Sequence, residues 1–217
     1  LKIRNENPDL IISKFWIPIM GPALGTSILI GKNNATSVSI IDNIIPHEHR
    51  IGDKLFSKYF TMTIDKFIVM SSSVREDMKN FTKTKPVILA PHPIYDNYGE
   101  ITDRKDSCTH IGLDPEFKYL MFFGFIRDYK GLDILLEAIN DDFFRKNKIK
   151  CLVAGEYYGN EQYYNDLIEK LKIEDLIIKR TDFIPNEEVK YYFSVVDVIV
   201  QPYKSATQSG ISQMAYH

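Results

Sequence analysis

Short apolar runs alternate with segments of helical periodicity along the whole chain. Each run is too short for a helix and is bounded by polar residues, glycine or proline, which is typical of a buried strand. Near-continuous apolar strands that alternate with helices are typical of parallel sheets covered on both faces. The predicted strands lie at residues 9–14, 37–42, 66–70, 86–90, 119–123, 148–154, 175–179 and 195–200.

The helices between these strands start at residues that favour a first helical turn. Pro22 lies just inside the start of an apolar helix, and Ser73 opens a sequence with the spacing of a capping box. In the second half, Gly131 opens a helix with one apolar stripe. Asn160 and Asn186 are candidate N-caps of the two helices that follow. The fold class predicted is α/β.

A polar stretch between the fourth and fifth strands divides the chain. From Asn97 to Pro115 the sequence is polar and weakly periodic, as in an interdomain linker, with one helical turn as an alternative. We therefore predict two α/β units, residues 1–97 and 117–217, joined by a linker at 98–116. The sequence begins without methionine and ends inside the helical pattern SGISQMAYH, so we expect a piece of a longer protein with both units incomplete.

The segment KYLMFFGFIRDYKGLDILLEAIN, residues 118–140, combines a strand, a tight turn and a helix. Gly124 lets the backbone come close to a ligand. The helix start after Gly131 presents free N–H groups with a partial positive charge. Arg127 and Lys130 add two cations in the turn, so together these features predict a diphosphate-binding site. The alternative is a surface loop with two solvated cations.

Composition narrows the classes of partner. The formal net charge is -2 over 217 residues, and the absence of a global basic field argues against nucleic acid. No apolar stretch reaches the roughly 18 residues of a membrane-spanning helix. Cys108 and Cys151 form neither a disulfide framework nor a metal motif, which favours a reducing compartment. The histidines show no metal-ligand spacing, and we expect no metal.

Further candidate ligand-binding residues follow other predicted strands. Ligands of parallel sheets bind past the carboxyl ends of the strands. The recurrence of such residues at five strand ends predicts a ligand cleft between the two domains. The five places are Asp42 with Asn43, residues 124–130, Gly155 with Glu156, Phe183 with Ile184, and residues 207–210.

The motifs FFGFIRDYKGLDILLEA, LVAGE and TDFIPNEEVKYYFSVVDVIVQPY resemble the donor-binding half of glycosyltransferase family 4. IIDNIIPHEH, KFIVMSSSVREDM and APHPIYD are similar to the second part of the family's acceptor domain. The resemblance extends from about Asp9 to His217. It implies two Rossmann-like domains in the GT-B arrangement. It also implies sugar transfer, with retention, from a nucleotide-diphosphate donor to a glycan or lipid-linked acceptor in cell-surface polysaccharide or glycolipid synthesis. No cofactor is implied, because the nucleotide sugar is a substrate.

The resemblance assigns the cationic turn to the donor diphosphate. Lys130 matches the family lysine that holds this group, and Gly124 matches the glycine at the end of the strand. The family arginine usually follows that glycine directly. Here Phe125 stands at that position and Arg127 comes two places later.

The resemblance also places the nucleoside. Phe183 and Ile184 match the segment that meets the nucleobase, largely through its backbone. Gly155 and Glu156 match the turn after the second donor-domain strand. The alternative for this second pair is simple turn chemistry.

Two glutamates eight residues apart are usual in the family, and this chain has neither. With Gly210 placed on the family's helix-start glycine, those positions become Thr207 and Ala215, and no Asp or Glu occurs after Asp197. SATQSG offers instead a hydroxyl-rich helix start that is a candidate for binding phosphate or ribose. The alternative is an ordinary Ser/Thr N-cap. The candidates are Thr207, Gln208, Ser209 and Gly210.

On the acceptor side, Asp42 replaces the histidine that is common in the family. It is the candidate catalytic residue, since a carboxylate there would orient an acceptor hydroxyl. Asn43, His47 and Glu48, with His49 beside them, are candidate acceptor contacts; the alternative is a solvated polar loop.

The missing glutamates leave a second hypothesis open, a non-catalytic nucleotide- or phosphate-binding α/β module. A dinucleotide-dependent oxidoreductase is disfavoured, because no G-x-G-x-x-G follows a predicted strand. We expect a cytoplasmic protein, and peripheral association with the inner membrane face stays open, since Lys54 to Lys66 is only mildly basic. We also expect this piece of the protein to be inactive by itself.

Overall fold

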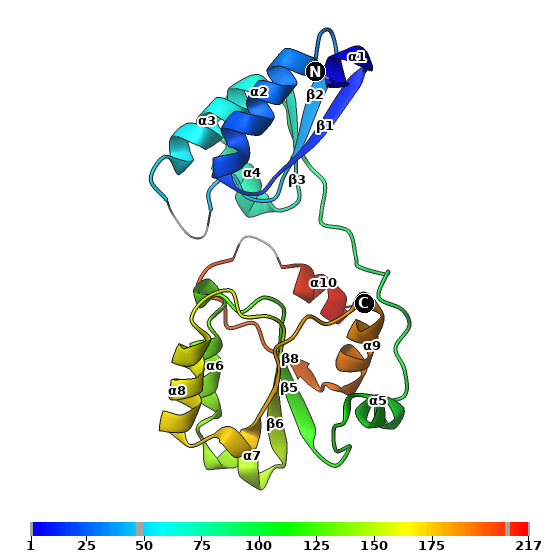
Figure 1. Ribbon diagram of the computed structural model, residues 1–217, viewed down its shortest axis with the longest axis vertical. Helices are drawn as coiled ribbons and strands as arrows, with labels where there is room; N and C mark the ends of the chain where they lie inside the picture. Colours follow the sequence, from blue (N-terminus) through cyan, green and yellow to red (C-terminus); the bar gives the residue numbers. More distant parts are fainter. Residues whose placement is uncertain (1, 47–49, 207–208, 217) are drawn as a thin grey trace. The chain divides into compact units, whose positions relative to one another are not determined.

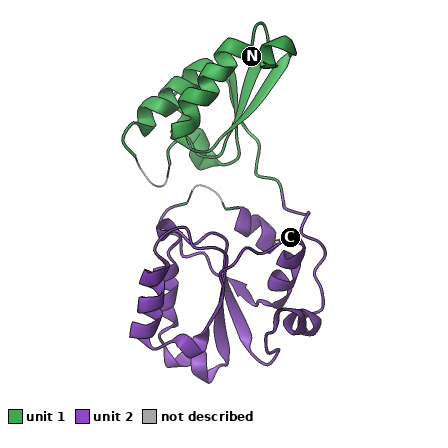
Figure 2. Cartoon of the chain, viewed as in Figure 1, with its two compact units in different colours: residues 1–93, 206–209 green, residues 94–205, 210–217 purple. Residues whose placement is uncertain are grey.

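The computed structural model describes residues 2–46, 50–206 and 209–216. The chain forms two compact units, residues 1–93 with 206–209 and residues 94–205 with 210–217 (Figure 1, Figure 2). Each unit contains one four-stranded sheet in which all paired strands are parallel. The predicted α/β class with two Rossmann-like parallel sheets is therefore confirmed.

The first unit is built around the sheet β1-β2-β3-β4. Its strands follow one another in the sheet in the same order as in the sequence. Asp42 comes directly after β2, at the carboxyl edge of this sheet. The elements are α1 (Lys2–Asn5), β1 (Leu10–Phe15), α2 (Gly21–Gly31), β2 (Thr36–Ile41), α3 (Asp53–Thr63), β3 (Lys66–Val69), α4 (Ser72–Met78) and β4 (Val87–Leu89).

The strand order of the first unit places its crossover helices on one face. Parallel crossovers are right-handed, so strands added always in the same direction put every crossover helix on the same side. Apolar residues of α2, α3 and α4 accordingly share one core cluster with inward residues of the strands, such as Phe15 and Phe67. Leu10, Ile12 and Ile88 point the other way and are more than half exposed. The expectation of cover on both faces is wrong for this unit within the described residues.

The second unit is built around the sheet β7-β6-β5-β8. After β5 the strands are added on one side, and β8 then returns to the opposite side of β5. The elements are α5 (Arg104–Ile111), β5 (Lys118–Phe123), α6 (Leu132–Ile139), α7 (Asp142–Lys146), β6 (Ile149–Ala154), α8 (Glu161–Leu171), β7 (Ile177–Arg180), α9 (Asn186–Val195), β8 (Val198–Ile199) and α10 (Gly210–Tyr216).

This reversal covers both faces of the second sheet. One core cluster joins α6 and α8 to strand residues such as Phe122 and Val153. The other joins α5 and α9 to Met121 and Leu152, which alternate with the first pair along the same strands. The second unit is therefore doubly wound, as the continuous apolar strands predict.

Several local details differ from the expectations. The stretch expected as a linker contains α5, capped by the Asp103 carboxylate and ended by Gly112 in the left-handed region. Cys108 of α5 is fully buried against α9 and the sheet. Polar residues dominate this helix, so its periodicity is weak in the sequence. The N-cap of α4 is Ser71, not Ser73.

Two predicted boundaries in the second unit also shift. Helix α9 has Pro185 at its N-cap, and Asn186 is the first helical residue and makes no side-chain cap. The helix continues to Val195, which shortens the predicted strand 195–200 to Val198–Ile199. Asn160 is the N-cap of α8 as predicted, with its side chain accepting from the Tyr163 amide at 3.3 Å. Among the described residues, no helix combines the length and apolar character needed to cross a bilayer.

Asp65 ties three elements of the first unit together. Its carboxylate accepts from the Ser37 amide and hydroxyl at 2.8 Å each, and from the Lys32 ammonium at 2.9 Å. These groups start β2 and end α2, and Asp65 itself precedes β3. Burial raises the pKa of Asp65, but the hydrogen bonds from Ser37 and Lys32 outweigh it and lower the pKa to about 2.

We predict that Asp65→Asn lowers the free energy of unfolding of the first unit by about 1–3 kcal/mol, because it removes charge-assisted hydrogen bonds. The folded pKa lies below the unfolded value of 3.8, so this stabilisation is present above pH 4 and is lost as pH falls toward about 2. Urea unfolding followed by the fluorescence of Trp16, the single tryptophan, measures both effects. An unchanged acid profile in the variant would contradict the prediction.

Candidate functional site

The candidate site lies where the winding of the second sheet reverses. Strand β5 has β6 on one side and β8 on the other. The winding of the sheet therefore reverses at β5. In open α/β sheets, ligands bind at such a switch point. The loop after β5, residues 124–131, and the loop after β8, residues 200–205, are the two walls of the candidate site.

The ends of β5 and β6 meet through two glycines. A Cβ atom on Gly155 would lie 2.5 Å from the carbonyl oxygen of Gly124, which no larger residue tolerates. A Cβ atom on Gly124 would lie 3.2 Å from the Nζ atom of Lys130. The ammonium of Lys130 thus rests directly on the backbone at the end of β5. The structure brings together the predicted Gly124 and Lys130.

Lys130 is a cation whose environment disfavours its charge. Burial lowers the pKa of Lys130 to about 8, and the positive charge of Arg127 adds to the effect. Among the described residues, no carboxylate forms an ion pair with this ammonium, and its nearest ring is that of Tyr203 at 5.9 Å. An anion placed here would offset both the cost of burying the ammonium and its repulsion by Arg127, so the arrangement favours anion binding.

Arg127 reaches the same area from the extended loop after β5. Its guanidinium carbon lies over the ring of Tyr158, 4.4 Å from the centroid. Tyr158 belongs to the loop after β6. The positive charge of Arg127 contributes to the lowered pKa of Lys130, so the two predicted cations lie near each other.

The loop after β8 is clamped to the cationic turn by Lys204. Its ammonium lies 2.9 Å from Asp128 Oδ1 and 2.8 Å from Asp133 Oδ2, and these hydrogen bonds raise the pKa of Lys204. Its backbone amide donates to the Tyr129 carbonyl at 2.8 Å. Sequence reasoning missed this clamp, because its partners are separated by more than 70 residues and no local pattern marks them.

Gly131 allows the two walls to touch. It adopts φ +71°, in the left-handed region, and a Cβ atom on it would lie 2.0 Å from the Pro202 carbonyl oxygen. It is also the N-cap of α6. Gly131 therefore serves the helix start, as predicted, and the contact with the β8 loop, which was not predicted.

Helix α10 follows the second wall. A Cβ atom on Gly210 would lie 2.8 Å from the ring of Tyr95, so this ring packs against the first turn of α10. Ser209 directly precedes the helix. Thr207 and Gln208, the other predicted phosphate or ribose residues, lie outside the described residues.

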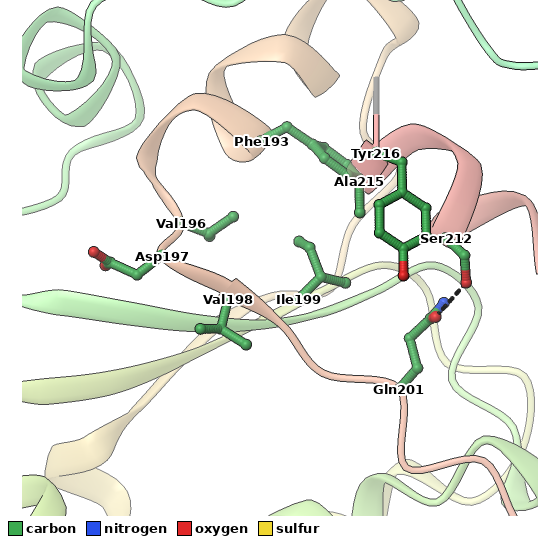
Figure 3. Close-up of a pocket in the computed structure, with 9 residues that line it drawn as sticks. All are labelled: Phe193, Val196, Asp197, Val198, Ile199, Gln201, Ser212, Ala215 and Tyr216. Atoms are coloured by element: carbon green, nitrogen blue, oxygen red, sulfur yellow. Dashed lines mark hydrogen bonds between the residues drawn. The ribbon is translucent and has the colours of Figure 1, made fainter.

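A cavity of about 280 Å³ lies between β8, the end of α9 and α10. In Figure 3 the Ser212 hydroxyl donates to Gln201 Oε1, a bond of 2.6 Å that joins α10 to the end of β8. Its lining combines apolar side chains such as Phe193 and Ile199 with polar residues such as Asp197. Arg127 and Lys130 do not line it, so the cavity is separate from the cationic turn.

The predicted nucleoside residues follow β6 and β7. Glu156 comes directly after Gly155, and its carbonyl accepts from the Ile126 amide at 2.8 Å. Phe183 is 71% exposed in the loop between β7 and α9. Ile184 is partly buried and its side chain packs against the core cluster that includes α9.

The candidate residues of the first unit lie after β2. Asp42 Oδ2 forms an ion pair with Lys14 at 3.2 Å. Its other oxygen, Oδ1, is buried and has no hydrogen-bond partner among the described residues. Asn43 follows and is partly buried, whereas His47, Glu48 and His49 lie outside the described residues.

No metal or cofactor site is evident among the residues that the structure describes. Three or more His, Cys, Asp or Glu side chains never cluster there in a way that would hold an ion. The two cysteines are buried and unpaired with each other.

Comparison with known sequences connects the chain to glycosyltransferases. No family model matches. The D-inositol 3-phosphate glycosyltransferases of Mycobacterium ulcerans (strain Agy99) and Mycobacterium marinum (strain ATCC BAA-535 / M) are each 30% identical to it over 103 residues. The match covers 46% of this chain and 21% of each relative, so it spans about a fifth of the relatives' length.

Solved structures share the fold. Sucrose-phosphate synthase from Thermosynechococcus elongatus matches with a TM-score of 0.73 at 14% identity, over 94% of this chain and 52% of its own. Anabaena HepE in complex with UDP and glucose matches with a TM-score of 0.73 at 13% identity, over 97% and 57%. WaaG, a glycosyltransferase of lipopolysaccharide biosynthesis, gives 0.63 at 11%, over 94% and 78%. The resemblance to group 1 glycosyltransferases of the GT-B type is confirmed, and at these identities the solved structures show a shared fold alone.

We predict that Gly131→Ala separates the two walls of the site, because the new methyl group meets the Pro202 carbonyl and the backbone is strained at positive φ. The free energy of unfolding of the second unit should fall by about 1–3 kcal/mol. Hydrogen-exchange mass spectrometry should show faster exchange in the peptide covering residues 198–205, which includes the Lys204 amide.

Gly159→Ala is the matched control, since a Cβ atom on Gly159 meets nothing within 4 Å. Equal exchange in the two variants would show that the contact between Gly131 and Pro202 does not hold the β8 loop.

Proposed function

We propose that this chain is part of a retaining glycosyltransferase that moves a sugar from a nucleoside-diphosphate donor to a glycan or lipid-linked acceptor. The observation that carries the proposal is the Lys130 ammonium, partly buried on the backbone of Gly124 without an ion-pair partner among the described residues. Such a cation at a switch point fits a diphosphate. The complex of HepE with UDP and glucose supports this class of donor.

The chemistry of transfer explains why cations are needed. As the sugar leaves, negative charge grows on the diphosphate, and groups fixed beforehand stabilise this charge in the transition state. Arg127 and Lys130, with the N–H groups at the start of α6, supply that stabilisation in the proposed site. Each contact is worth about 2–4 kcal/mol. No step in this scheme requires a metal.

Asp42 is the proposed acceptor-side residue. Its Oδ2 atom pairs with Lys14 at 3.2 Å, and Oδ1, which has no partner among the described residues, is the atom that we propose accepts from an acceptor hydroxyl. A carboxylate in this position orients an acceptor hydroxyl. The acceptor is proposed to be a glycan or lipid-linked sugar of surface polysaccharide or glycolipid synthesis.

A cytoplasmic location is proposed with this activity. Its support is the presence of two free, buried cysteines, which suits a reducing compartment. Peripheral attachment to the inner membrane face belongs to the same proposal and follows from a lipid-linked acceptor.

One observation favours a second function, a nucleotide- or phosphate-binding module without transfer activity. No Asp or Glu occurs after Asp197, and the two positions that are usually glutamate in the resembled family are Thr207 and Ala215. A protein of this kind would bind UDP or pyrophosphate and release no sugar. Transfer and donor-hydrolysis assays of the full-length protein with a panel of nucleotide sugars separate the two functions.

We predict that Lys130→Ala in the full-length protein lowers the transfer rate by about 10²–10³-fold, because the diphosphate loses one positive contact. Lys105→Ala is the control, since Lys105 is an exposed lysine on α5 far along the chain from the turn. The measurement is initial transfer rate with saturating nucleotide sugar, with circular dichroism to show that each variant is folded. Equal rates for the two variants would remove the diphosphate role of Lys130.

The depressed pKa of Lys130 predicts a pH dependence of donor binding. A bound diphosphate stabilises the ammonium, so the pKa rises in the complex and binding takes up a proton when the free lysine is neutral. The Kd for UDP should therefore be flat below pH 8 and rise above it, by up to about tenfold per pH unit. The value of about 8 for the free protein sets the start of this rise.

Isothermal titration calorimetry in two buffers of different ionisation enthalpy measures both the Kd and the proton uptake. Lys130→Arg is the control, because a guanidinium does not titrate in this range. A wild-type profile as flat as that of Lys130→Arg would contradict the assignment.

A further inference from the structure

Arg127 is held by an aromatic pair at the carboxyl ends of β5 and β6. Its guanidinium carbon lies 4.4 Å from the ring centroid of Tyr158. The edge of Phe125 meets the Tyr158 ring at a centroid distance of 5.2 Å and an interplanar angle of 66°. Both rings are largely exposed, Phe125 at 49% and Tyr158 at 61%. Two large exposed aromatic rings beside a cationic site call for an explanation other than core packing.

The backbone fixes this arrangement. The ladder between β5 and β6 continues past the strands through hydrogen bonds from the Gly124 amide to Ala154, the Ile126 amide to Glu156, and the Tyr158 amide to Ile126, at 2.9, 2.8 and 2.9 Å. Ile126 and Tyr157 pair across the two loops and pack into the core under α6 and α8. Because side chains alternate along extended chains, Phe125, Arg127 and Tyr158 are presented on the opposite side.

An aromatic partner suits an arginine that must bind an anion. A guanidinium over a ring face is attracted by the ring quadrupole and keeps its N–H bonds directed outward in its own plane. The ring therefore orders a flexible side chain through a contact with the guanidinium face. It also keeps Arg127 in place against the repulsion of the neighbouring Lys130.

We propose that Tyr158 is a positioning residue for diphosphate binding, which acts through Arg127, and that Phe125 supports the Tyr158 ring. The inference rests on the proposed function, since it takes the diphosphate as the ligand of Arg127. In the resembled family the arginine usually stands directly after the glycine, where this chain has Phe125. Here Phe125 packs against Tyr158, and Tyr158 in turn holds Arg127, which comes two places later.

Tyr158 could instead stack directly on a nucleobase, and comparing UDP with inorganic pyrophosphate distinguishes this role from the positioning of Arg127. If Tyr158 stacked directly on a nucleobase, its loss would weaken the binding of UDP and leave inorganic pyrophosphate unaffected. If it positions Arg127, its loss weakens both ligands to the same extent. Direct stacking would also persist after Arg127 is removed.

The experiment is a double-mutant cycle in the full-length protein, with UDP and inorganic pyrophosphate as probes in calorimetric titrations. Arg127→Ala is expected to raise the Kd of both ligands about tenfold or more. Tyr158→Ala is expected to raise it about threefold to fivefold. In the Arg127→Ala background, Tyr158→Ala should change neither Kd. Tyr158→Phe keeps the ring face and should bind as the wild type does.

Two further variants exclude a general structural effect. Tyr158→Leu keeps apolar contact with Phe125 but has no π face, so it should bind as weakly as Tyr158→Ala while retaining the wild-type unfolding midpoint. Phe143→Ala removes an exposed ring from α7 and should leave both Kd values unchanged.

Equal losses from Tyr158→Ala with and without Arg127, wild-type binding by Tyr158→Leu, or a loss confined to UDP would each overturn the positioning role and leave the proposed function standing. Failure of the wild-type protein to bind UDP or pyrophosphate would instead overturn the proposed function, and this inference with it.

Discussion

The burial of the Lys130 ammonium on the Gly124 backbone is the interaction on which the candidate site depends. A lysine in water is strongly hydrated, and moving it partly out of water costs free energy that a carboxylate usually offsets. Here burial lowers the pKa of Lys130 to about 8, and no carboxylate among the described residues forms an ion pair with it. Nearby Lys204 is the counter-example, since Asp133 and Asp128 bind it and raise its pKa. Lys204 thus holds two loops together, whereas Lys130 is the lysine that the proposed function assigns to the ligand.

The winding of each sheet decides where such a site can form. In the second unit, β8 returns to the far side of β5. Gly131 and the Lys204 clamp then bring the loops after these two strands into contact beside Lys130. In the first unit the strand order never reverses, so the described residues create no switch point there. Asp42 instead lies at the end of a strand whose neighbours are wound the same way.

Features of this fold were predictable from the sequence where the interacting residues lie close together along the chain. The strand, turn and helix from β5 to α6 are encoded within about 20 residues, and Gly124, Lys130 and Gly131 have the places the pattern predicts. The full length of helix α5 was not predicted, because its buried face is small and its cap uses ordinary polar residues. The clamp at Lys204 and the ring under Arg127 were not predicted for another reason. Each contact joins segments that are far apart in the sequence and that only the sheet brings together, so no local sequence pattern predicts it.

The departures from the resembled family concern its charged residues. Phe125 takes the position of an arginine, and the last part of the chain has no carboxylate after Asp197. Under the proposed function, a diphosphate site without that arginine needs another cation held in place, and Arg127 over Tyr158 supplies one. A carboxylate near these cations would compete with the diphosphate for them. Asp128 and Asp133, which belong to the turn and to α6, pair with Lys204 instead. In this proposal the missing glutamates and the displaced arginine are physically consistent with each other.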